Sequence, residues 1–195
     1  MKTIYFILIL TISLFITTSC NTNDDNFYNT VYLNYPNVVI IDTPPSYQMN
    51  DYLRVKADFS RFVPEENQST LLDIRKTTGN AAAFIFSYIL EKKNSSNTWD
   101  LVIIPTNQLN IIKGDAISGS YVYGKCLYNT ATEKYEYNVG VPLTAAGDYR
   151  LSFGYAFKSK NIELISDSNG SNLLLHISTT TNNLNSEGYY LFTVI

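Results

Sequence analysis

The sequence predicts an all-β fold, and three observations lead to that prediction. The chain has 195 residues, with 16 tyrosines and 10 phenylalanines, and aromatic and β-branched residues favour strands. Several segments alternate apolar and polar residues with the two-residue period of a strand. No stretch has the 3.6-residue apolar period of an amphipathic helix. We therefore expect an antiparallel β-sandwich built around one hydrophobic core.

The positions of the predicted strands follow from these patterns. Residues 53–59 are apolar at every second position, which predicts one buried and one solvent-facing side. Residues 82–90 are apolar on both sides, which predicts a central strand. We expect a loop over residues 92–98 and a strand over residues 99–104. For residues 71–76 we expect a strand rather than a helical turn.

Two neighbouring segments predict a β-hairpin, and their side chains predict its register: residues 121–128 and residues 135–141. Pairing Tyr128 with Tyr135 places Cys126 opposite Tyr137, on a face made only of apolar or small residues. A shift by one residue would mix polar and apolar side chains on each face. Cys126 is therefore expected to be a small buried hydrophobic residue rather than a reactive thiol.

The segment LTAAGDYRLSF, residues 143–153, resembles the corner that precedes strand F in immunoglobulin-like sandwiches. In that family, a tyrosine follows a tight turn and its hydroxyl binds backbone groups upstream. The matching residue here is Tyr149, which follows a turn at Gly147 and Asp148. The resemblance implies an immunoglobulin-like antiparallel β-sandwich, with Trp99 as the central core tryptophan.

The N-terminus has the layout of a bacterial secretion signal. Lys2 precedes an apolar run over residues 4–16, and small residues then lead into Cys20. The run is shorter than the roughly 20 residues that span a bilayer, and it fits a secretory signal peptide. The junction resembles the bacterial lipobox, although Thr17 stands where the family usually has leucine. The resemblance implies removal of residues 1–19 and a lipid anchor on Cys20. The alternative is an ordinary cleaved signal that leaves Cys20 as a spare thiol.

Residues 20–29 are polar and hold too little apolar surface to fold. We therefore expect a lipidated tether there, followed by a single domain over residues 30–195. Within the tether, Asp24, Asp25 and Phe27 resemble the short acidic export signal of Bacteroidota surface lipoproteins. That resemblance implies an outer-membrane protein displayed on the cell surface. If the two aspartates are only part of a solvated linker, the protein lies on the periplasmic face instead.

Composition and motifs argue against catalysis, cofactors and nucleic-acid binding. The net charge is −3, which gives no basic patch for a phosphate backbone. Apart from Cys20, the one cysteine is Cys126, and His176 is the one histidine, so neither a disulfide within the fold nor a zinc site is expected. The chain has no GxSxG elbow, P-loop or GxGxxG motif. We expect a non-enzymatic protein with no cofactor and no bound metal.

The tyrosine content predicts a binding surface, because tyrosine combines an apolar ring with a polar tip. Tyr121 and Tyr123 fall on the predicted outer face of the hairpin, with Tyr123 covering Gly140 on the neighbouring strand. The leading hypothesis is a non-catalytic outer-membrane lipoprotein that serves as a binding or structural module for an envelope protein partner. The alternative is a glycan-binding accessory lipoprotein of a polysaccharide-uptake system, in which exposed tyrosines stack against sugars.

Overall fold

The computed structural model describes residues 29–154, 160–167, 172–181 and 183–195. Within these ranges the chain consists of strands, one short α-helix, α2 (Ile74–Thr77), and one 3-10 turn, η1 (Thr106–Gln108). The predicted all-β fold is confirmed. The predicted signal peptide, the lipidation site Cys20 and the acidic segment of the tether lie outside the described residues.

Thirteen of the described strands belong to one hydrogen-bonded sheet. In chain order they are β1 (Asn29–Asn34), β2 (Val39–Ile41), β3 (Tyr52–Ser60), β6 (Ala83–Lys93), β7 (Trp99–Leu101), β8 (Asn110–Lys113), β9 (Asp115–Ser118), β10 (Val122–Asn129), β11 (Lys134–Pro142), β12 (Gly147–Phe153), β13 (Asn161–Ser166), β14 (Leu173–Thr180) and β15 (Tyr189–Val194). A separate pair consists of β4 (Phe62–Val63) and β5 (Leu72–Asp73). The long strand β6 is central, because β10 pairs with one edge and β12 and β13 with the other.

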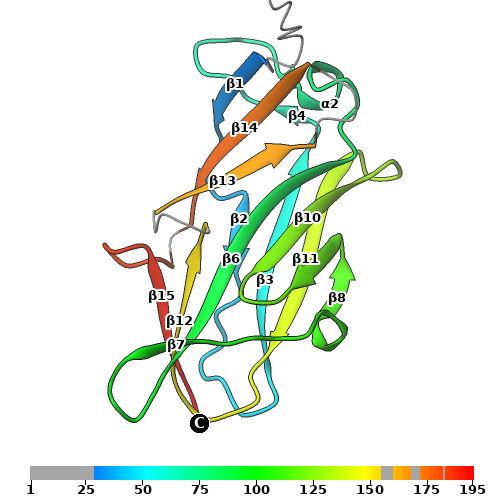
Figure 1. The fold of residues 1–195 in the computed structure, drawn as a ribbon. Coiled ribbons are helices and arrows are strands. Elements are labelled where there is room, and N and C mark those ends of the chain that lie inside the picture. The colour runs from blue at the N-terminus through cyan, green and yellow to red at the C-terminus, as the bar shows by residue number, and fades with distance from the viewer. Residues whose placement is uncertain (1–28, 155–159, 168–171, 182) are drawn as a thin grey trace, which may run out of the picture.

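The sheet curls so that its two halves face each other across the hydrophobic core. One half contains β6 with β10, β12 and β13, and the other contains β11 with β3 and β2. Figure 1 shows β6 and β13 in front of β2 and β3. Aromatic rings fill the space between the halves. The ring centroid of Phe84 on β6 lies 5.5 Å from that of Phe59 on β3 and 4.8 Å from that of Tyr135 on β11.

Two strand predictions are confirmed. β6 is the central strand expected over residues 82–90. β3 covers the alternating segment and buries every second residue, namely Leu53, Val55, Ala57 and Phe59. These predictions succeeded because the period of two is a local property of a strand that has one face on the core.

The pairing of the described strands is antiparallel apart from β1 with β14 and an isolated parallel bridge between Tyr47 and Val194. The sheet is therefore antiparallel, as expected, except at these two places. β1 and β14 run in the same direction, with Tyr32 opposite His176. Whether the sandwich is immunoglobulin-like stays a prediction.

Three expectations about local structure are wrong. Residues 71–76 do not form one strand, because β5 ends at Asp73 and α2 follows; the Asp73 carboxylate accepts a hydrogen bond from the Lys76 amide, which caps the helical turn. Trp99 is half-buried rather than central, because β7 is a short strand at the end of β6. The guanidinium of Arg150 stacks 4.6 Å from its ring centroid. The predicted strand over residues 99–104 ends at Leu101.

The β10–β11 hairpin has the predicted pair Tyr128–Tyr135 next to its turn, but the two strands then separate. β9 pairs with β10 and β8 pairs with β11, so these two strands lie between the separated parts of β10 and β11. We call this separation of β10 from β11 the fork. The predicted pairing of Cys126 with Tyr137 is therefore wrong, and Cys126 pairs with Phe84 of β6. Cys126 is nevertheless fully buried, as predicted.

Tyr149 lies on β12 and makes the hydrogen bond expected of a tyrosine corner. Its hydroxyl donates to the backbone oxygen of Ala145 at 2.7 Å. Its ring is buried and stacks against Phe192 of β15, with 5.5 Å between the ring centroids. The side chain therefore joins the turn before β12 to the last strand of the sheet, which is a structural role.

Candidate functional site

Tyr121 and Tyr123, the sequence-predicted binding residues, lie beside a surface hollow at the start of β10. Its volume is about 380 Å³, and it is lined by Ile117, Ser118, Gly119, Ser120, Tyr121 and Tyr123. Tyr123 lies between Ser87 of β6 and Ile117 of β9 in the sheet. Residues directly opposite on neighbouring strands point to the same side, so these three side chains share one face.

The same face continues across five strands as a row of paired residues. Lys125 pairs with Ile85, Ile85 with Ile165, Ile165 with His176, and His176 with Tyr32. The alternate residues of β6 and β10 are buried in the core, so this row faces away from it. We call this surface the open face: Tyr32, Ile85, Ser87, Ile117, Tyr123, Lys125, Ile165 and His176.

The open face exposes apolar surface, and its charged groups are paired. Tyr32 is 72% exposed and Ile117 is 54% exposed. Lys125 Nζ lies 3.7 Å from Asp115 Oδ2, and His176 Nδ1 lies 2.6 Å from a carboxylate oxygen of Glu163. The Tyr32 ring packs on the His176 ring, with 5.0 Å between the centroids. These pairs leave a mainly apolar and aromatic surface with a polar border.

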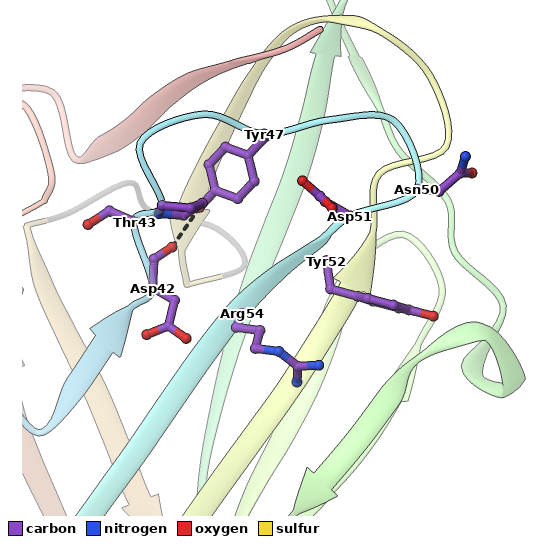
Figure 2. Close-up of a pocket in the computed structure, with 8 residues that line it drawn as sticks. Asp42, Thr43, Tyr47, Asn50, Asp51, Tyr52 and Arg54 are labelled. Atoms are coloured by element: carbon purple, nitrogen blue, oxygen red, sulfur yellow. Dashed lines mark hydrogen bonds between the residues drawn. The ribbon is translucent and has the colours of Figure 1, made fainter.

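A second hollow lies in the loop between β2 and β3 (Figure 2). Its volume is about 540 Å³, and it is lined by Asp42, Thr43, Pro44, Tyr47, Asn50, Asp51, Tyr52 and Arg54. We call it the β2–β3 hollow. The loop lies at the end of the fold where the C-terminus lies, whereas β1 is at the opposite end (Figure 1).

Hydrogen bonds from three parts of the chain hold this loop in place. The Tyr47 hydroxyl donates to the Asp42 backbone oxygen at 2.6 Å, and burial raises the pKa of Tyr47 well above its usual value. The backbone amide of Asn50 donates to the backbone carbonyl oxygen of Leu143 at 2.8 Å. The backbone amide of Ile195 donates to the backbone carbonyl oxygen of Tyr47 at 3.0 Å. The hollow is therefore formed before any ligand arrives.

Two of the side chains that line the β2–β3 hollow, Tyr52 and Arg54, come from β3. Tyr52 is 41% exposed and lies against Gly140 of β11, where an added Cβ would come within 2.9 Å of the Tyr52 Cβ. The Arg54 guanidinium donates to Asn110 Oδ1 at 2.6 Å and makes a longer contact to Asn138 Oδ1 at 3.4 Å. These contacts fix the orientation of a cationic side chain beside an aromatic ring.

The sequence prediction missed this hollow. It placed Tyr123 over Gly140, but β10 and β11 have separated there, and Tyr52 covers the glycine instead. The alternation predicted over residues 53–59 places Arg54 on the solvent-facing side of a strand, which is correct locally. The sequence signal that could have indicated this site is the spacing of Tyr52 and Arg54. Residues two positions apart on a strand point to the same face.

The described residues contain no group of three or more His, Cys, Asp and Glu side chains that could hold a metal ion. The carboxylates of Asp115 and Glu163 lie against Lys125 and His176 of the open face. Burial raises the pKa of the Cys126 thiol well above its usual range, which disfavours the nucleophilic thiolate. In the part of the chain that the structure describes, no helix is long and apolar enough to cross a bilayer.

Comparisons with known proteins give no match: no family model, no curated protein and no solved structure matches this chain.

Proposed function

We propose that this protein is a non-catalytic lipoprotein of the outer membrane that is anchored through Cys20 and binds an envelope protein partner through the open face. The anchor is supported by the apolar run, the small residues and the cysteine at the N-terminus. The observation that carries the binding role is that the open face, which runs across the sheet from Tyr123 to Tyr32, points away from the core and exposes aromatic and aliphatic surface.

The chemistry of the open face suits a protein partner. Exposed apolar patches bordered by polar groups are typical of interaction sites, and tyrosine is enriched among residues that dominate interface energies. Lys125 already forms an ion pair with Asp115, and the His176 ring already contacts the Glu163 carboxylate on this chain. A partner could therefore cover the face without leaving an unpaired buried charge, which would oppose binding.

The position of the open face also suits a partner held at the same membrane. Tyr32 belongs to β1, which directly follows the proposed tether. An anchor at Cys20 would therefore hold this edge of the sheet close to the lipid surface. Anchoring two proteins to one membrane raises their effective concentration, so that a modest interface is sufficient.

The test is affinity purification of the tagged full-length lipoprotein from outer membranes, with the co-purifying proteins identified by mass. We expect a stoichiometric envelope protein with the wild type and its loss with Ile117→Asp. The matched control is Ile40→Asp, because Ile40 is 50% exposed on β2 in the other half of the sheet. The proposal fails if no protein co-purifies, or if Ile117→Asp retains as much partner as Ile40→Asp does.

A further inference from the structure

The β2–β3 hollow has features that the binding of a protein partner to the open face does not explain. Figure 2 shows the side chains of Asn50, Tyr52 and Arg54 extending toward the same side of the loop and strand. The hollow lies at the opposite end of the fold from β1 (Figure 1). With the lipid anchor before β1, this end would point away from the membrane and toward soluble ligands.

The Tyr52 ring provides a platform for an apolar surface. Gly140 carries no side chain, so the ring lies directly on the β11 backbone and keeps 41% of the residue exposed. The Cζ atom of Arg54 lies 5.7 Å from the ring centroid. A tyrosine held in this way offers a rigid aromatic face at little cost in conformational entropy. The C–H face of a pyranose ring matches such a platform.

Polar groups border this platform. A guanidinium has five N–H donors, and the contacts to Asn110 and Asn138 use two of them. Within the described residues, no carboxylate forms an ion pair with Arg54. Asn50 has a positive φ of 72° at the tip of the loop, where its amide side chain can both donate and accept. Vicinal hydroxyl groups are suitable partners, since each hydroxyl also donates and accepts.

The charges of the hollow favour a neutral ligand. Its lining contains the cationic Arg54 and the carboxylates of Asp42 and Asp51. Asp42 forms an ion pair with Lys56, and Asp51 accepts a hydrogen bond from the Gln48 amide at 2.7 Å. An anion near Arg54 would therefore also meet negative charge within the same hollow.

We propose that the β2–β3 hollow binds a neutral pyranose unit of a polysaccharide, stacked on Tyr52 and hydrogen-bonded through its hydroxyls to Arg54 and Asn50. The volume of about 540 Å³ falls within the roughly 300–1,000 Å³ of small-molecule sites. The hollow is open at the surface, so a longer chain can extend beyond it. This site is separate from the open face and does not depend on the protein partner.

The experiment is native electrophoresis of the detergent-solubilised full-length protein through gels that contain one polysaccharide each. The probes are an α-glucan, a β-glucan, an α-mannan and a galactan, with polygalacturonate as the acidic counterpart. We expect retardation by at least one neutral probe. Tyr52→Ala should weaken that binding at least tenfold, and Tyr52→Phe should preserve it because the ring remains.

Two further variants keep the test decisive. Arg54→Gln should weaken binding about tenfold at an unchanged melting temperature, which covers the case in which Tyr52→Ala fails to fold. Tyr123→Ala, on the open face, should bind the polysaccharide as the wild type does. The inference is overturned if no neutral probe retards the wild type, if only polygalacturonate does, or if Arg54→Gln and a folded Tyr52→Ala bind as the wild type does.

Discussion

The hydroxyl groups of Tyr88 and Tyr137 lie 3.0 Å apart in the core, between the two halves of the curled sheet. Tyr88 is 0% exposed and Tyr137 is 1% exposed. Burial raises the pKa of both hydroxyls well above the usual value, so both remain neutral. One hydroxyl donates to the other, and this bond joins β6 to β11 across the core.

Removal of both hydroxyls should cost less than the sum of the two single removals. Tyr88→Phe or Tyr137→Phe leaves the other hydroxyl buried without its partner, which costs about 1–3 kcal/mol. The double variant leaves no unpaired hydroxyl, so its loss should be smaller than the sum of the single losses. Urea unfolding of the four proteins measures this coupling free energy. Additive losses would show that the two hydroxyls do not depend on each other.

Gly114 is the residue that allows β8 and β9 to fill the fork between β10 and β11. Its φ is +77°, and an added Cβ would lie 2.6 Å from the Lys125 oxygen and 2.9 Å from the Glu136 oxygen. Both atoms belong to the backbone of strands in the sheet, so they cannot easily move away. A side chain here therefore conflicts with the local backbone conformation and with both branches of the fork.

Gly114→Ala should lower the free energy of unfolding by about 2 kcal/mol or more, because left-handed strain alone costs about 1–3 kcal/mol. The matched control is Gly119→Ala, where an added Cβ meets nothing within 4 Å. That change should leave stability within about 0.5 kcal/mol of the wild type. Thermal and urea unfolding provide the comparison. Equal effects of the two substitutions would contradict the close packing of the fork.

Glu136 holds the same fork through its side chain. Its carboxylate accepts hydrogen bonds from Asn129 and Lys113 at 3.0 Å each and from Thr132 at 3.2 Å. The hydrogen bond from Asn129, and then the one from Lys113, lowers the pKa of Glu136 below its usual value. The ionised form is therefore bound more tightly in the folded state than in the unfolded chain.

A lowered pKa in the folded state adds stability above the unfolded pKa of about 4.3, and that stability is lost as the pH falls through the folded pKa. Glu136→Gln should therefore cost about 1–3 kcal/mol at pH 7 and progressively less below about pH 4. Urea unfolding at several pH values measures this difference. Asp58→Asn, in the exposed pair with Lys134, is the control and should change stability little. A cost of Glu136→Gln that does not change with pH would contradict the ionic role.

The strands with a simple alternating pattern were predictable, because their exposure depends on one local face. β3 shows this, since Val55 is buried and Arg54 is not. The fork was not predictable, because nothing near Asn138 in the sequence indicates that β8 (Asn110–Lys113) will replace β10 as the neighbour of β11. Propensity favours a hairpin there, and the tertiary pairing of distant strands decides otherwise.

The β2–β3 hollow shows the same limit. The sequence indicated that Arg54 faces solvent, but not that the side chains of Asn110 and Asn138 would hold its guanidinium. These partners come from β8 and β11, so the site exists only after the fork has formed. The prediction of a core position for Trp99 was wrong for a related reason: composition favours a buried tryptophan, but the short strand β7 at the end of β6 leaves Trp99 only half-buried.

Lipidation at Cys20 is tested directly by its replacement. Cys20→Ala should abolish fatty-acid labelling and release the protein from the membrane fraction, because stable anchoring needs the acyl chains, each buried CH₂ of which contributes about 0.8 kcal/mol. Cys126→Ala is the matched control, since that thiol is 0% exposed and cannot be reached by a modifying enzyme in the folded protein. It should retain both labelling and membrane retention. A Cys20→Ala protein that stays in the membrane with unchanged labelling would contradict the lipoprotein assignment and would require another attachment to explain how the open face meets a membrane partner.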